Sequence, residues 1–160
     1  MVREIEEALH NIYEHDYKDD QTLEATSLQF RLLKDNGFTV QSDMFNKFKD
    51  NERNFKKSLT SDMEGLLDLY EAAHLRVHGD DIIEESLAFN TTHSSLAKVA
   101  GTIEYPLSAF VSHAVYRPIR KSWLRLEARR FISIYGDDAS HDELLMNFVE
   151  LGFNLLQISH

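Results

Sequence analysis

Residues 61–79, SDMEGLLDLYEAAHLRVHG, decide the fold class of this chain. Ser61 and Glu64 have the spacing of a capping box, in which the serine accepts a backbone N–H and the glutamate reaches back to the start of the helix. Apolar and weakly polar side chains then recur at the three-to-four-residue spacing of one helix face, namely at Leu66, Leu67, Tyr70, Ala73 and His74. The stretch is therefore predicted to form an amphipathic helix that Gly79 ends.

The chain on both sides of this stretch is also predicted to be helical, because two prolines and six glycines are its only strong breakers and strand-like alternation is lacking. In the helix expected at 22–36, Leu28, Leu32 and Leu33 form the expected apolar stripe, and Gly37 is placed to end it. Short connections predict antiparallel neighbours within one domain. The other helices are expected at 4–14, at 42–48, from residue 80 or 81 onward, at 107–117, at 123–135 and from Ser140 onward.

Composition excludes several classes of protein. The formal charge of −10, from 27 acidic and 17 basic residues, disfavours nucleic acid and anionic membranes as partners. No cysteine is present, so disulfides and thiolate metal sites are excluded. No apolar run reaches the roughly 18 residues of a membrane span. The acidic first residues resemble neither a signal peptide nor a transit peptide, and a cytoplasmic location is expected.

Two acidic patterns imitate metal-binding motifs. Asp80, Asp81 and Glu84 imitate an aspartate-rich motif, but they stand at a predicted helix start, where carboxylates interact favourably with the helix dipole. Asp35 and Asp43 imitate a second motif only loosely, since Gly37 would break the helix that this motif requires. The Asp-x-Asp-Asp string, whose acid could protonate an alkene, does not occur. We therefore predict no metal ligands, no cofactor-binding residues and no catalytic residues in this chain.

The histidines and arginines have ordinary structural interpretations. His74 and His78 are four residues apart, but they lack the His-Glu-x-x-His pattern of zinc proteases, so a helix-terminal role is favoured. No Gly-x-Ser-x-Gly nucleophile elbow occurs. The basic cluster is interpreted as a solvated face, with diphosphate binding as the alternative; its members are Arg117, Arg120, Lys121, Arg125, Arg129 and Arg130.

Several ordered motifs resemble one protein family. Residues 27–50, SLQFRLLKDNGFTVQSDMFNKFKD, and residues 65–79 are similar to stretches of plant terpene synthases of the sesquiterpene, cadinene-type group. Four shorter motifs follow in the order that the family has them: PIRK at 118–121, LEAR at 126–129, ISIY at 132–135 and FNLLQ at 153–157. The resemblance extends over essentially the whole chain and points to the N-terminal domain of the family.

The resemblance implies an all-α fold, with residues 1–160 forming an incomplete α-helical (α/α) barrel. It also implies a separate C-terminal catalytic domain, in which two acidic motifs bind three Mg²⁺ ions and ionise farnesyl diphosphate. The sequence is expected to end before that domain. The chain is therefore expected to be a scaffold that is non-catalytic by itself, with the C-terminal domain as its partner and farnesyl diphosphate bound only by the full-length parent.

Two other functions stay open. The chain could be a stand-alone helical module from a truncated gene that binds other proteins. It could also be a degenerate enzyme that retains weak prenyl-diphosphate binding at the arginine cluster.

Overall fold

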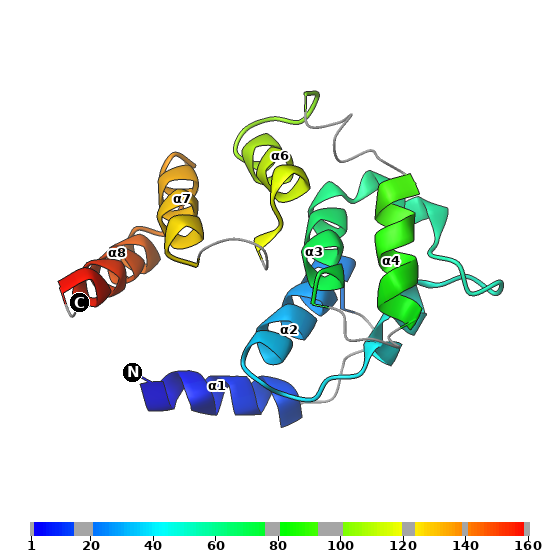
Figure 1. Ribbon diagram of the computed structural model, residues 1–160, viewed down its shortest axis with the longest axis horizontal. Helices are drawn as coiled ribbons and strands as arrows, with labels where there is room; N and C mark the ends of the chain where they lie inside the picture. Colours follow the sequence, from blue (N-terminus) through cyan, green and yellow to red (C-terminus); the bar gives the residue numbers. More distant parts are fainter. Residues whose placement is uncertain are drawn as a thin grey trace. The chain divides into compact units, whose positions relative to one another are not determined.

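A computed structural model describes residues 2–14, 21–75, 81–92, 101–119, 124–138 and 141–158. The chain divides into two compact units, residues 1–98 and 99–160. The first unit contains α1 (Val2–Glu14), α2 (Leu23–Asp35), the 3₁₀ helices η1 (Ser42–Phe48) and η2 (Lys57–Ser61), α3 (Met63–Ala73) and α4 (Asp81–Thr92). The second contains α6 (Leu107–Tyr116), α7 (Leu124–Gly136) and α8 (Glu143–Ile158) (Figure 1). The described residues thus form an all-α structure without strands, with one isolated β-bridge between Lys49 and Phe55.

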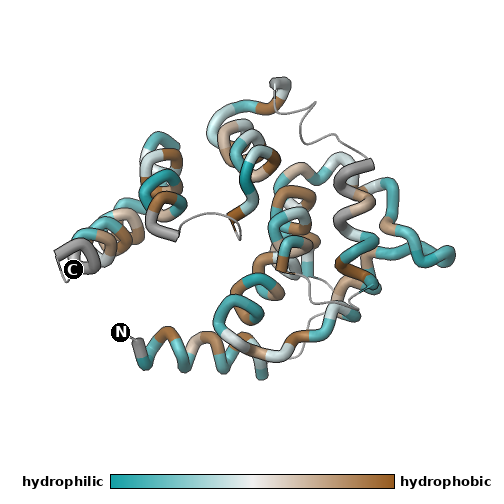
Figure 2. Tube along the Cα trace, viewed as in Figure 1, coloured by the Kyte–Doolittle hydropathy of each residue, from teal (hydrophilic) through white to brown (hydrophobic). Residues whose placement is uncertain are grey.

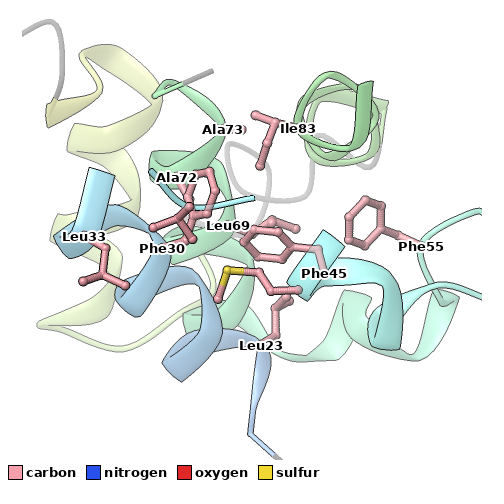
Figure 3. Close-up of a cluster of buried hydrophobic side chains, with 11 residues drawn as sticks. Leu23, Phe30, Leu33, Phe45, Phe55, Leu69, Ala72, Ala73 and Ile83 are labelled. Atoms are coloured by element: carbon pink, nitrogen blue, oxygen red, sulfur yellow. The ribbon is translucent and has the colours of Figure 1, made fainter. Parts of the chain in front are cut away.

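The core of the first unit lies where α2, α3, α4 and η1 meet (Figure 3). The rings of Phe30 on α2 and Phe45 on η1 are fully buried and meet edge to face, with their centroids 5.4 Å apart. Leu69 on α3 and Ile83 on α4 are fully buried in the same cluster. Burial of each such side chain stabilises the fold by roughly 1.5–3 kcal/mol.

The buried face of α2 differs from the predicted one. Leu28 and Leu32 are 38% and 39% exposed, whereas Leu33 is fully buried. Leu23 and Phe30 are the other large buried side chains of this helix. Rotation of about 100° per residue puts Leu28 and Leu32 on one side of the helix and Phe30 with Leu33 on another. The side that carries the aromatic ring faces the core, so of the predicted stripe of Leu28, Leu32 and Leu33 only Leu33 is buried.

The ends of α2 follow the sequence signals closely. The Thr22 hydroxyl accepts a hydrogen bond from the Ala25 N–H at 3.2 Å, which caps the first turn. At the other end, Gly37 adopts a φ of +83°, a conformation that glycine reaches without a Cβ clash. The Phe38 N–H bonds the Leu33 carbonyl at 3.0 Å, and this bond completes a Schellman motif. The predicted helix stop at Gly37 is confirmed.

The capping box predicted at Ser61 is displaced to the aspartate that follows it, and an aspartate also caps the start of α8. The Asp62 carboxylate, not the Ser61 hydroxyl, accepts the Gly65 N–H at 2.9 Å and begins α3. The Asp142 carboxylate accepts the Leu145 N–H at 2.9 Å at the start of α8, while Ser140 lies outside the described residues. An aspartate is as good an N-cap as serine and adds a favourable interaction with the helix dipole.

Polar and aromatic contacts hold the second unit together. The rings of Phe110 on α6 and Phe131 on α7 have their centroids 5.6 Å apart. The Tyr105 hydroxyl donates to the Asp137 carboxylate at 2.7 Å, across the ends of the same two helices. Figure 2 shows hydrophobic and hydrophilic residues interleaved along the described helices. None of the helices in the described ranges has the length and hydropathy needed to cross a membrane.

Candidate functional site

The acidic patterns that imitate metal motifs lie at helix ends. Asp81 and Glu84 occupy the first turn of α4, and Asp80 lies outside the described residues. Asp35 is the last residue of α2 and Asp43 lies in the first turn of η1, on the other side of the Gly37 turn. Within the described ranges, His, Asp and Glu side chains do not gather in threes where they could hold a metal ion.

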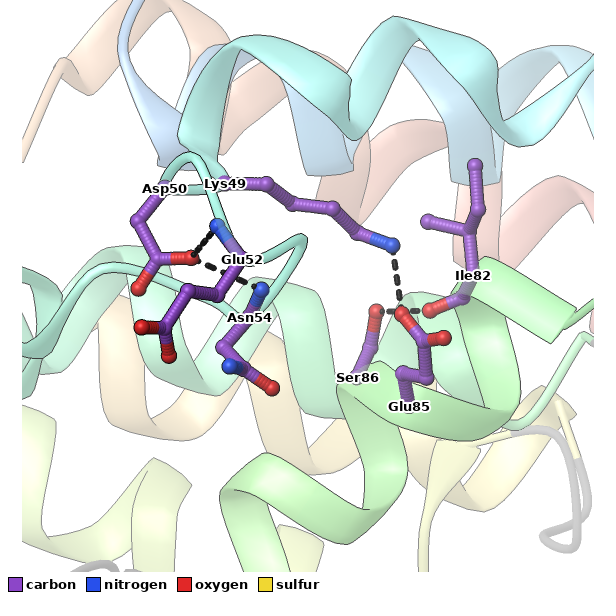
Figure 4. A network of polar contacts seen from close by, with 7 residues as sticks. All are labelled: Lys49, Asp50, Glu52, Asn54, Ile82, Glu85 and Ser86. Atoms are coloured by element: carbon purple, nitrogen blue, oxygen red, sulfur yellow. Dashed lines mark hydrogen bonds and ion pairs between the residues drawn. The ribbon is translucent and has the colours of Figure 1, made fainter.

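One carboxylate organises the turn that follows η1. Asp50 Oδ1 accepts hydrogen bonds from the backbone N–H groups of Glu52 and Asn54 at 2.9 and 3.0 Å (Figure 4). The preceding residue, Lys49, forms an ion pair with Glu85 on α4 and lies above the Phe55 ring, with its nitrogen 5.6 Å from the ring centroid. The Lys49–Glu85 ion pair therefore joins the turn to α4, and the cation–π contact between Lys49 and Phe55 stabilises the turn itself.

An open groove of about 770 Å³ lies between this turn and α4. The neighbouring rings of Phe55 and Phe89, with centroids 5.4 Å apart, contribute its apolar lining. Three of the lining residues are acidic and one is Lys57, so the groove repels an anion such as a diphosphate. The full lining consists of Asp50, Asn51, Glu52, Asn54, Phe55, Lys57, Glu85, Ala88 and Phe89.

Among the described residues, the carboxyl group with the largest pKa shift, Asp68, lies between α2 and α3. Arg31 Nη1 is 3.3 Å from Asp68 Oδ1, and each side chain is only 21% exposed. Burial raises the pKa of the Asp68 carboxyl to about 6, and the Arg31 guanidinium lowers it without cancelling that effect. Nearby carboxylates raise the same pKa further, namely those of Glu24, Glu64 and Asp62. The sequence gives no sign of this pair, because its members are 37 residues apart.

The histidines have structural partners. His74, at the end of α3, has Nδ1 2.8 Å from the Tyr70 carbonyl and its ring in an edge-to-face contact with the Tyr70 ring. His78 lies outside the described residues. His113 on α6 has Nε2 2.7 and 2.8 Å from the two carboxylate oxygens of Glu127 on α7, and both side chains are largely buried. Sequence reasoning missed this pair, since nothing in a spacing of 14 residues indicates a contact.

The arginine cluster is only partly described. Arg117 follows the last residue of α6, and Arg129 and Arg130 lie on α7; all three are exposed. Arg120 and Lys121 lie outside the described residues, as does the side chain of Arg125. The three described arginines are exposed, so the solvated face and the diphosphate-binding alternative both stay predictions.

Comparison with known proteins shows which family this chain resembles. The family model described as "Terpene synthase, N-terminal domain" matches residues 2–115. Isozyme XC14 of (+)-delta-cadinene synthase from Gossypium arboreum is 49% identical over 160 residues, which are 100% of this chain and 28% of the relative. Valencene synthase from Vitis vinifera is 50% identical over 161 residues, covering 99% of this chain and 29% of the relative.

Solved structures agree with the sequence comparisons. Isoprene synthase from grey poplar leaves superposes with a TM-score of 0.78 at 34% identity, over 87% of this chain and 26% of that one. A limonene synthase crystallised with 2-fluorolinalyl diphosphate gives a TM-score of 0.83 at 29% identity, and the match covers 97% of this chain and 30% of that one. The chain spans little more than a quarter of the length of the curated relatives. It belongs to the plant terpene synthase family, as an N-terminal domain segment of the sesquiterpene synthase type.

Proposed function

We propose that this chain is a non-catalytic scaffold portion of a plant sesquiterpene synthase whose parent reaction is the Mg²⁺-dependent cyclisation of farnesyl diphosphate. The match of residues 2–115 to the N-terminal domain supports this function, as does the 49% identity to a (+)-delta-cadinene synthase. The cytoplasmic location expected from the sequence stays a prediction.

The observation that carries the proposal is the structural use of the carboxylates. Diphosphate becomes a good leaving group when metal ions neutralise its charge, and several converging oxygen ligands are needed to hold such ions. Here Asp50 and Asp62 accept backbone N–H groups, and Asp68 pairs with Arg31 between two helices. These three carboxylates therefore stabilise a turn, a helix end and a helix pair, and the His, Asp and Glu side chains in the described ranges do not gather in threes that could hold Mg²⁺ ions.

The metal chemistry is proposed to reside elsewhere in the parent polypeptide. The isoprene synthase of grey poplar has been crystallised with three Mg²⁺ ions and dimethylallyl-S-thiolodiphosphate. This chain covers 26% of that protein. We assign diphosphate ionisation to the C-terminal catalytic domain of the parent, and we assign this chain the task of supporting that domain.

A chimera tests the scaffold role directly. The chain would replace the 160 aligned residues of the Gossypium arboreum isozyme XC14, and terpene products would be measured by gas chromatography with Mg²⁺ and farnesyl diphosphate supplied. We expect the chimera to release product, because the exchanged segment supplies support rather than chemistry. A folded chimera without product would contradict the proposal.

Two controls make the chimera interpretable. Phe30→Asp within the chimera puts a charge into the buried core and is expected to abolish both folding and product. Leu28→Asp changes a partly exposed position on the same helix and is expected to preserve both. Circular dichroism of each purified variant separates loss of folding from loss of turnover.

The stand-alone interaction module is favoured by one observation, the large apolar side chains that α8 leaves exposed. A monodisperse monomer that melts cooperatively, together with an inactive chimera, would support the module over the scaffold.

A further inference from the structure

Asn36 and Gly37, at the end of α2, form a dipeptide in which the asparagine amide is easily lost. In this reaction the backbone nitrogen of the following residue attacks the side-chain carbonyl carbon of the asparagine. A side chain on the following residue obstructs the attack, and glycine has none. Every other asparagine of the sequence precedes a residue that carries a side chain. Position 36 is therefore the one asparagine whose neighbour favours the reaction.

The reaction needs only water besides the two residues. The Gly37 nitrogen forms a bond to Asn36 Cγ and loses its proton, while the bond from Cγ to Nδ2 breaks and the amide leaves as ammonia. The cyclic imide that results takes up one water molecule. Hydrolysis at one of its carbonyl groups gives aspartate. Hydrolysis at the other gives isoaspartate, in which the backbone runs through the former side chain.

Hydrogen bonds at the end of α2 hold both reacting groups. Asn36 Nδ2 donates to the Leu32 carbonyl at 2.8 Å, so the side chain is held toward the preceding turn of the helix. The Gly37 N–H donates to the Lys34 carbonyl at 3.1 Å. Asn36 and Gly37 are nevertheless exposed, so water reaches them. The closed turn, rather than burial, is therefore what restrains the reaction.

Phe38 keeps this turn closed. Its N–H donates to the Leu33 carbonyl at 3.0 Å, and its partly buried ring packs against the core of the first unit. The ring also lies beside that of Tyr13 on α1, with the two centroids 5.1 Å apart. Opening of the turn therefore breaks apolar and ring contacts as well as backbone hydrogen bonds, and such local openings are much rarer than fraying of an unsupported helix end.

We propose that Asn36 is a site of spontaneous deamidation whose rate is set by opening of the turn from Asn36 to Phe38. The new carboxylate lies beside Asp35 at the C-terminal end of α2, where the helix dipole disfavours negative charge. The donor that now satisfies the Leu32 carbonyl is lost, and an isoaspartate lengthens the backbone inside the turn. Each conversion therefore weakens the end of α2. The site does not depend on the proposed scaffold function.

Prolonged incubation of the full 160-residue chain at neutral pH tests the proposal. Peptide mapping by mass spectrometry locates the exchange of ammonia for water, and a methyltransferase specific for isoaspartate identifies that product. We expect both at residue 36 and no change at the other asparagines over the same interval. The chain unfolded in guanidinium chloride is expected to react at least roughly tenfold faster, because no turn restrains it. Equal rates in the folded and unfolded chain, or a native chain that stays unmodified at residue 36, would overturn the proposal.

Variants of the turn test its control of the rate. Phe38→Ser is expected to accelerate deamidation of the folded chain roughly tenfold, since it removes the apolar contacts that close the turn. Leu28→Ser, at a 38% exposed position on the same helix, is the matched control and should leave the rate unchanged. Asp35→Lys replaces an acid by a base in the last turn of α2, which stabilises the helix end, and is expected to slow the reaction at least about twofold.

Two further outcomes decide between the proposal and its alternatives. An unchanged rate in Phe38→Ser would refute control by the turn, and so would an unchanged rate in Asp35→Lys, which keeps the test decisive if circular dichroism shows that Phe38→Ser is unfolded. Asn36→Gln keeps an amide at this position but would need a larger ring to react. The denaturation midpoint of the wild type is expected to decrease during incubation while that of Asn36→Gln stays constant; equal decreases would refute the effect of deamidation on stability.

Discussion

Replacing Asp68 by asparagine is expected to change how the stability of the protein depends on pH. Burial between α2 and α3 raises the pKa of this carboxyl from 3.8 to about 6. The native state therefore keeps the proton between about pH 4 and pH 6, where the unfolded chain has already released it. Because the native state then binds more protons, the contribution of Asp68 to stability is fully present below about pH 4 and falls as the pH rises through about 6.

The magnitude follows from the size of the pKa change. Each pKa unit corresponds to about 1.4 kcal/mol, so a rise from 3.8 to about 6 costs the native state about 3 kcal/mol at neutral pH. The amide that the Asp68→Asn substitution introduces cannot ionise. The unfolding free energy of the variant minus that of the wild type is therefore expected to increase by about 3 kcal/mol between about pH 3 and pH 7.

Urea denaturation followed by far-UV circular dichroism, repeated at several pH values, measures this difference. Glu52→Gln removes an exposed carboxylate and supplies the background against which the Asp68 effect is judged. A difference that stays flat with pH would refute the burial argument. A difference that decreases as the pH rises would show that the attraction of Arg31 outweighs burial.

Three further predictions concern the core, a helix end and metals. Phe30→Ala, at a fully buried ring in contact with Phe45, is expected to lower the unfolding free energy by about 3–5 kcal/mol in urea melts, and Leu28→Ala by much less. Asp62→Ala removes the N-cap of α3 and should lower the unfolding free energy by about 1 kcal/mol in the same assay. A larger decrease in Ser61→Ala than in Asp62→Ala would show that the serine is the N-cap after all. Calorimetric titration with Mg²⁺ or Zn²⁺ is expected to show no stoichiometric binding; one tight site per chain would contradict this.

Much of the helical order follows from the sequence, because local signals specify where helices begin and end. Thr22 and Gly37 bound α2 through a hydroxyl cap and a left-handed glycine, both of which are local features. Which side of α2 is buried was not predictable in the same way. Leu28 and Phe30 are both apolar, and the packing of α3 and η1 against α2 decides which of them is buried.

In the candidate site, too, features with a local cause were predictable and features that depend on tertiary packing were not. The helix-end position of Asp81 and Glu84 was predictable, since acidic first turns have a local electrostatic cause. The pairs Arg31–Asp68 and His113–Glu127 join different helices, so their geometry depends on tertiary packing that no local spacing encodes. The family resemblance was confirmed because it rests on several ordered motifs rather than on any one of them.

Turnover by the purified chain alone tests the central claim most directly. Equal amounts of this chain and of the full-length isozyme XC14 of Gossypium arboreum would be incubated with Mg²⁺ and farnesyl diphosphate, and terpene products would be quantified by gas chromatography. We expect product from the full-length enzyme and none above background from this chain, because Asp50, Asp62 and Asp68 are engaged in a turn, a cap and an ion pair and the described acidic residues do not converge on a metal site. Terpene product from the chain alone, proportional to its concentration, would contradict the scaffold assignment.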